Sequence, residues 1–157
     1  MKLTQKDPSA ATGTLSMFFR CDEAHSGLDN VAFLSRDQIS FVEDAGDTLH
    51  AQRNALDSGY VWDVDKDYSK AASQPIRWLA EGRDASATLD AANGGFGSND
   101  GDNEITGLHV SDGDPSVDGV LGAKVPDLQN PHWRWFYTQQ HGDNRTYEVN
   151  LRRHHDE

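Results

Sequence analysis

Apolar residues in this chain recur at every second position, and no long stretch keeps the 3.6-residue period of an amphipathic helix. In the clearest run, alternate positions are occupied by Leu15, Met17, Phe19 and Cys21. Further runs cover residues 30–34, 39–43, 60–64, 76–80, 104–110, 133–138 and 146–152. They are rich in β-branched or aromatic residues and are bounded by Gly, Asp, Asn or Pro, which is typical of strands and turns. The pattern predicts a mostly antiparallel, all-β protein, in which residues 85–92 form a short helix or a loop.

Composition limits what such a protein can bind. The 157 residues include 36% hydrophobic ones, enough for the core of one domain. With 14 Lys and Arg against 26 Asp and Glu, the net charge is −12, which disfavours nucleic acid and favours cations. No apolar run is long enough to cross a membrane, and no signal peptide opens the chain, so we expect a cytoplasmic protein or part of an exported one. The single Cys21 excludes an internal disulfide and a multi-cysteine zinc site.

Two halves of the chain repeat one strand order. Residues 29–33 and 102–106 both begin with Asp-Asn, residues 39–47 and 135–143 both close on Gly-Asp, and a third strand follows in each half. A fourth strand, near 75–79, follows only in the first half. This order is that of a four-stranded propeller blade, although a sandwich or meander is the alternative.

The propeller interpretation divides the chain into four parts. Residues 14–22 would be an outer strand, 29–83 a complete blade, 84–101 an insertion loop, and 102–152 a blade that lacks its fourth strand. The glycine-rich insertion is either a surface linker or a lid. Propellers have 4–8 blades, so residues 1–157 would be the carboxyl-terminal part of a larger, incomplete ring. Its missing blades would come from an absent amino-terminal part or from a partner chain.

Acidic residues gather where the predicted strands begin and end. Glu43 and Asp44 lie at a strand exit, and Asp29 and Glu104 lie at strand starts. Carboxylates grouped without a neighbouring Lys or Arg suit a hard cation, so Glu43, Asp44 and the nearby Asp47 are candidate metal ligands, and Glu104 is either unpaired or a ligand. The alternatives are a solvated acidic turn at Glu43 and Asp44, and simple turn formation at Asp29.

Among the histidines and tryptophans, one histidine is a candidate site residue and the others named here are expected to be structural. His141 follows a strand exit and could transfer a proton or bind metal, or it could be a plain surface residue. We assign His50 and His109 to structure. The four tryptophans are expected to pack between blades; they are Trp62, Trp78, Trp133 and Trp135.

Three motifs, in order, resemble the PhoX-type alkaline phosphatases. Residues 29–33 and the strand into Glu43-Asp44 resemble that family's Pro-Asp-Asn-Leu-Ala-Phe segment and the Asp-Gly that follows it. Residues 104–107 resemble its Glu-x-Thr-Gly motif, and residues 140–142 its Gln-His-Pro-Gly, with the Pro absent. The family's Arg-Pro-Glu region, its ligand cysteine and its twin-arginine export signal have no counterpart here.

The resemblance implies a usually exported propeller that hydrolyses phosphate esters with calcium and iron. By that resemblance Asp29, Asp44 and Glu104 would be metal ligands, and His141 would contact phosphate or a ligand. Glu104 and His141 are the expected catalytic residues, and the isolated chain is expected to be inactive. The alternatives are a non-catalytic propeller that serves as a binding or scaffold module, and a lactonase-type propeller with one divalent cation.

Overall fold

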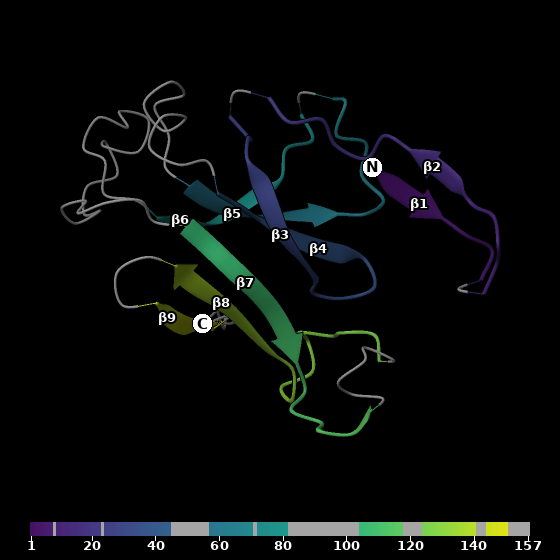
Figure 1. Cartoon of the computed structure of the whole chain (residues 1–157). Coiled ribbons are helices and arrows are strands. Elements are labelled where there is room, and N and C mark those ends of the chain that lie inside the picture. Colours follow the sequence, from purple (N-terminus) through teal and green to yellow (C-terminus); the bar gives the residue numbers. More distant parts are fainter. Residues whose placement is uncertain are drawn as a thin grey trace, which may run out of the picture.

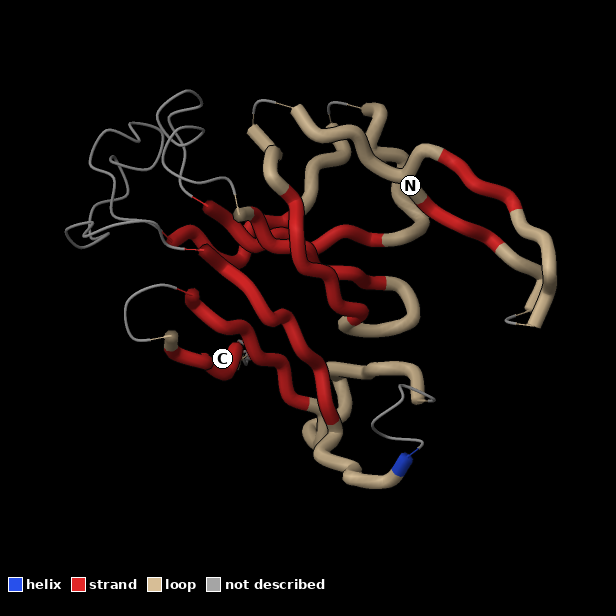
Figure 2. Tube along the Cα trace, viewed as in Figure 1, coloured by secondary structure: helices blue, strands red, loops and turns tan. Residues whose placement is uncertain are grey.

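The computed structural model describes residues 1–7, 9–22, 24–44, 57–70, 72–81, 104–117, 124–140 and 144–150. Within these ranges every regular element is a strand, and antiparallel pairing joins the strands into three sheets (Figures 1 and 2). The strands are β1 (Lys2–Thr4), β2 (Thr14–Ser16), β3 (Leu28–Phe33), β4 (Gln38–Glu43), β5 (Asp57–Asp63), β6 (Ile76–Glu81), β7 (Glu104–Ser111), β8 (Arg134–Gln140) and β9 (Arg145–Val149). The predicted all-β, antiparallel class is confirmed.

The largest sheet is a four-stranded meander in which each strand pairs with the next along the chain, in the order β3-β4-β5-β6. The turn from β3 to β4 is closed by Ser35, whose Oγ accepts hydrogen bonds from the amides of Asp37 and Gln38, both at 3.1 Å. This Ser-based turn satisfies two backbone donors that the strands leave unpaired. The four strands predicted between residues 29 and 83 are therefore present in the predicted order.

The second sheet is a three-stranded meander in the order β7-β8-β9. Its register places Tyr137 opposite Tyr147 and Trp135 opposite Val149, so these four side chains share one face of the sheet. That face turns toward the four-stranded sheet, and Tyr137 stacks on Tyr147 with ring centroids 5.2 Å apart. The three strands predicted between residues 102 and 152 are therefore present in the predicted order.

The hydrophobic core lies between these two sheets. Val42, Ile105 and Tyr137 are its buried centre, and Trp78 reaches across to Trp135 with ring centroids 4.3 Å apart. Trp78 fits because Gly59 has no side chain: a Cβ there would lie 2.5 Å from the indole ring. Trp78 and Trp135 therefore pack between the two sheets, and the expectation that these sheets are propeller blades stays a prediction.

The opposite face of the four-stranded sheet is covered, over Tyr60 and Trp62, by the described residues 17–22 and 24–27, which we call the cover segment. Trp62 is fully buried beneath it, and the ring of Phe19 meets the Trp62 ring edge-on at 5.2 Å. His25 packs on Tyr60 at 4.8 Å. Edge-to-face ring contacts of this kind add to the free energy gained by burial. Both faces of this sheet are therefore covered around Tyr60 and Trp62, whereas Val31 and Phe33 of β3 are about half exposed.

The amino-terminal strand differs from the prediction. Only Thr14–Ser16 is a strand, and it pairs with β1 as a separate two-stranded sheet. The remainder of the predicted strand, up to residue 22, runs over the four-stranded sheet because Phe19 is drawn onto Trp62. The predicted insertion at 84–101, with the helix or loop at 85–92, lies outside the described residues. In the described part of the chain, no helix has the length and apolar character needed to cross a membrane.

Candidate functional site

The first strands of the two larger sheets, β3 and β7, lie side by side (Figure 1), and one asparagine connects them. Asn30 accepts a hydrogen bond from the Gly107 amide through Oδ1 at 2.8 Å. Its Nδ2 donates to Asp29 Oδ2 at 2.7 Å. The Asp29 carboxylate is exposed at the start of β3, with one oxygen held by this amide. Two of the three motifs are therefore in direct contact.

Gly107 can reach Asn30 because β7 is irregular at this point. The register between β7 and β8 shifts between Thr106 and His109, and Gly107 has a φ of +62°. This left-handed conformation favours glycine, and a Cβ there would lie 3.0 Å from Thr138 Oγ1. The bulge directs the Gly107 amide toward the other sheet. The backbone conformation at position 107 thus explains why this position of the Glu-Ile-Thr-Gly motif is occupied by glycine.

The third motif meets the second through strand pairing. Glu104 begins β7 and is the register partner of Gln140, the last residue of β8. The backbone of Glu104 is described but its side chain is not, and His141 lies outside the described residues. Their assignment as catalytic or ligand residues stays a prediction.

Glu43 lies inside the protein rather than at an open edge. Its side chain is 0% exposed. Oε1 accepts a hydrogen bond from the Ser26 amide at 2.9 Å, and Oε2 accepts one from the Ser58 amide at 3.0 Å. Because both oxygens are engaged by backbone donors, the carboxylate joins the cover segment to β5. Each oxygen keeps a further lone pair, so the assignment of Glu43 as a metal ligand stays a prediction.

Asp44 follows directly and is half-buried. Its amide donates to the Gly27 carbonyl at 2.8 Å, which extends the pairing of β4 with the residues before β3. Since Leu28 is the register partner of Glu43, Asp29 and Asp44 lie at the same end of the β3–β4 hairpin. Asp47 and His50 lie outside the described residues.

The described residues do not complete a metal centre. Among them, no group of three or more His, Cys, Asp or Glu side chains is arranged to hold a metal ion. Asp29 and Asp44 are the predicted ligands whose side chains are described and are not fully buried. Calcium and iron therefore remain expectations that rest on the resemblance.

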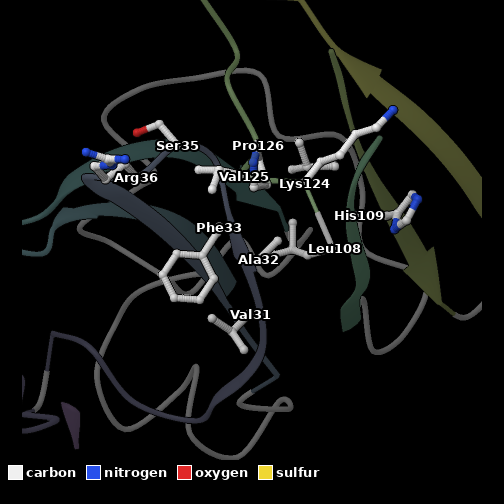
Figure 3. A pocket seen from close by; sticks show the side chains of 11 residues that line it. Val31, Ala32, Phe33, Ser35, Arg36, Leu108, His109, Lys124, Val125 and Pro126 are labelled. Atoms are coloured by element: carbon white, nitrogen blue, oxygen red, sulfur yellow. The ribbon is translucent and has the colours of Figure 1, made fainter. Parts of the chain in front are cut away.

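A groove of about 570 Å³ lies between β3, β7 and the segment before β8 (Figure 3). Its wall is largely apolar, and Val31 and Phe33 are 48% and 54% exposed there. His109, which we had assigned to structure, is exposed on this groove. The alternation of β3 indicated which residues share its exposed face, but not what would lie opposite them.

Lys124 lines this groove, and two neighbouring aspartates offset its positive charge. Its Nζ contacts Asp112 Oδ2 at 2.7 Å and Asp114 Oδ2 at 2.5 Å. Hydrogen bonds from Lys124 and Ser116 lower the pKa of Asp114 to about 2, and the same aspartates raise the pKa of Lys124. An anion in the groove would therefore gain little from this lysine.

A contact between the buried His25 and the exposed Asp22 in the cover segment was missed by the sequence reasoning. His25 is buried, and its Nδ1 lies 2.8 Å from Asp22 Oδ1. Burial raises the pKa of Asp22, but hydrogen bonds and the charge of His25 outweigh that effect, so the pKa falls below its ordinary value. The spacing Asp-x-x-His is common enough that it offered no usable signal.

Comparison of the chain with family models, with curated proteins and with solved structures finds no match. The resemblance to the PhoX-type family therefore rests on the three motifs themselves. Two of them are joined by the Asn30 hydrogen bond, and the second and third by the pairing of Glu104 with Gln140.

Proposed function

We propose that this chain forms two consecutive blades of a β-propeller phosphoester hydrolase similar to the PhoX-type alkaline phosphatases. The observation that carries the proposal is the meeting of the three motifs at adjoining strand ends. Asn30 of the first motif bonds Gly107 of the second, and Glu104 of the second pairs with Gln140 of the third. The Asn30 bond brings together two motifs that are 77 positions apart in the chain.

The arrangement of the sheets supports the propeller part of the proposal. In a propeller, the first strands of neighbouring blades adjoin at the channel while the sheets pack face to face. Here β3 and β7 adjoin, and the two sheets share the core around Val42 and Ile105. The remaining blades would come from the rest of the parent polypeptide or from a partner chain.

The charge of this edge supports a cation-assisted reaction. A phosphate ester approaching Asp29 and Glu104 would be repelled by their carboxylates, in a chain whose net charge is −12. Bound calcium or iron would supply the positive charge that offsets this repulsion. Asp29 is an exposed, described carboxylate that fits such a role, whereas Glu43 is fully buried and already accepts a backbone hydrogen bond at each oxygen.

The test uses the longest natural polypeptide that contains this sequence. We expect it to hydrolyse p-nitrophenyl phosphate and to lose activity in EDTA. Asp29→Asn and Glu104→Gln should each lower activity by at least about 100-fold. Asp37→Asn is the matched control, because Asp37 lies at the opposite end of the same hairpin. Activity that is indifferent to chelation, or equal losses in all three variants, would reject the proposal.

The second candidate is a non-catalytic propeller module that binds a partner. It is favoured by the engagement of Glu43 and by the groove with the exposed Val31 and Phe33. Elemental analysis of the purified polypeptide discriminates between the two. A hydrolase of the proposed kind carries stoichiometric metal, whereas a binding module carries none.

A further inference from the structure

We propose that Asn30 is a positioning residue that holds the Asp29 carboxylate in a fixed orientation relative to β7. The inference rests on the proposed function, because it assigns Asp29 to the site. The two hydrogen bonds of the Asn30 side chain, to Asp29 and to Gly107, are called here the Asn30 bridge.

The chemistry of the two neighbours allows one orientation of the Asn30 amide. A backbone amide such as that of Gly107 can only donate a hydrogen bond, so it must face Oδ1. An ionised carboxylate such as that of Asp29 can only accept, so it must face Nδ2. The observed bonds of 2.8 and 2.7 Å satisfy both requirements at once. Aspartate, serine or alanine at position 30 cannot supply both functions in the same place.

The bridge also joins the first strands of the two larger sheets, which share the hydrophobic core. Asn30 and Gly107 are 77 positions apart in the chain and belong to different sheets. Gly107 offers its amide only because the bulge in β7 and the φ of +62° turn it toward β3. A movement of β7 would therefore move the partner of Asn30, and through Asn30 the carboxylate of Asp29.

Two substitutions separate the two bonds. In Asn30→Asp, the new carboxylate can still accept from Gly107, but it repels Asp29 instead of donating to it. In Asn30→Ala, both bonds are lost. Gln38→Glu is the charge-matched control for Asn30→Asp, because it adds the same charge at the far end of the same hairpin, where Gln38 is exposed.

A double exchange separates positioning from a purely structural role. Asp29→Asn combined with Asn30→Asp restores a donor and an acceptor between the two side chains and keeps the acceptor for Gly107. It therefore restores the hydrogen bonds but places the carboxylate one residue away from its natural position. A structural pair would regain function in this variant, whereas a positioning pair would regain only stability.

The experiment measures kcat and KM for p-nitrophenyl phosphate, and hydrogen–deuterium exchange of residues 104–111, in the longest natural polypeptide. We expect Asn30→Asp and Asn30→Ala to lower kcat by about tenfold or more while KM changes less than about twofold. The double exchange should keep the stability of the natural polypeptide without recovering kcat. Exchange in residues 104–111 should become about threefold to tenfold faster in Asn30→Ala alone.

The experiment distinguishes failure of the positioning role of Asn30 from failure of the proposed hydrolase function. If Asn30→Asp has the kcat of Gln38→Glu, or if the double exchange recovers kcat, Asn30 does not position Asp29. If the natural polypeptide hydrolyses no phosphate ester, the proposed function fails and the exchange measurement alone decides. Faster exchange in Asn30→Ala than in Gln38→Glu then supports the Asn30 bridge, and equal exchange overturns it.

Discussion

The two larger sheets share one order of antiparallel strands but differ in how the described residues surround them. The four-stranded sheet is covered on one face by the cover segment and on the other by the three-stranded sheet. The three-stranded sheet has one face in that shared core. Its other face carries Arg134, Phe136, Thr138 and Glu148, and is mostly polar or exposed. Similar strand order therefore does not imply similar burial, because burial depends on what packs from elsewhere in the chain.

The largest expected difference between the sheets concerns one aromatic side chain in each. Trp62→Ala should lower the free energy of unfolding by about 3–5 kcal/mol, because Trp62 is fully buried and contacts Phe19 and Phe41. Phe136→Ala should cost about 1 kcal/mol, since Phe136 is half-buried beside Arg134. Urea denaturation of both variants checks this. Equal losses would mean that the polar face of the three-stranded sheet is as well covered as the face under the cover segment.

A smaller loss is expected at the buried carboxylate of the four-stranded sheet. Glu43→Gln should cost about 2–3 kcal/mol, because the amide nitrogen of glutamine would face a backbone donor where an oxygen now accepts. Asp37→Asn should change stability by less than about 0.5 kcal/mol, since Asp37 is exposed. Thermal unfolding measures both. A Glu43→Gln variant as stable as Asp37→Asn, but depleted in metal, would restore Glu43 as a ligand.

One glycine in each sheet offers a finer comparison. Gly59→Ala should cost about 2 kcal/mol, because the new Cβ would displace the Trp78 ring. Gly107→Ala should cost about 1 kcal/mol, since its left-handed φ is strained for alanine and the Cβ contacts Thr138. Denaturant midpoints of the two variants test this order. A reversed order would show that the bulge in β7 is more rigid than the core at Trp78.

The smallest change in stability is expected when acid protonates Glu148 on the polar face of the three-stranded sheet. Arg134 donates hydrogen bonds to Glu148, and these, with the charge of Arg134, lower the pKa of Glu148 below its ordinary value of 4.5. A lowered folded-state pKa gives stability that is present above pH 4.5 and is lost as the pH falls through the lowered pKa. The loss should be small, because the pair is solvent-exposed. Unfolding midpoints of the natural protein and of Glu148→Gln should therefore converge as the pH falls from 4.5 through the lowered pKa of Glu148.

Much of the fold could be predicted because strand signals are local. Alternating residues and the Gly, Asp and Asn that bound them placed both meanders correctly, including the fourth strand near Ile76. The strand over residues 14–22 was too long in the prediction. Its apolar residues alternate as a strand would, but Phe19 is used against Trp62, which is distant in the sequence.

The site was predictable only in part, because its contacts join residues that are distant in the sequence. The Asp-Asn and Glu-Ile-Thr-Gly motifs drew attention to the correct strand starts. The donors that decide what Glu43 does are the amides of Ser26 and Ser58, 17 and 15 residues away. A carboxylate at a strand end therefore looks the same in sequence whether it binds a metal or joins strands. The groove at Val31 and Phe33 was missed because it requires β3 and β7 to adjoin.

The cover segment has a practical consequence for handling this protein. A polypeptide that started at Leu28 would keep all four strands of its sheet, yet it would expose the rings of Phe41, Tyr60 and Trp62 to water. Such a shortened species would tend to self-associate during expression, whatever its catalytic competence. Proteolytic trimming of the cover segment is accordingly expected to promote aggregation.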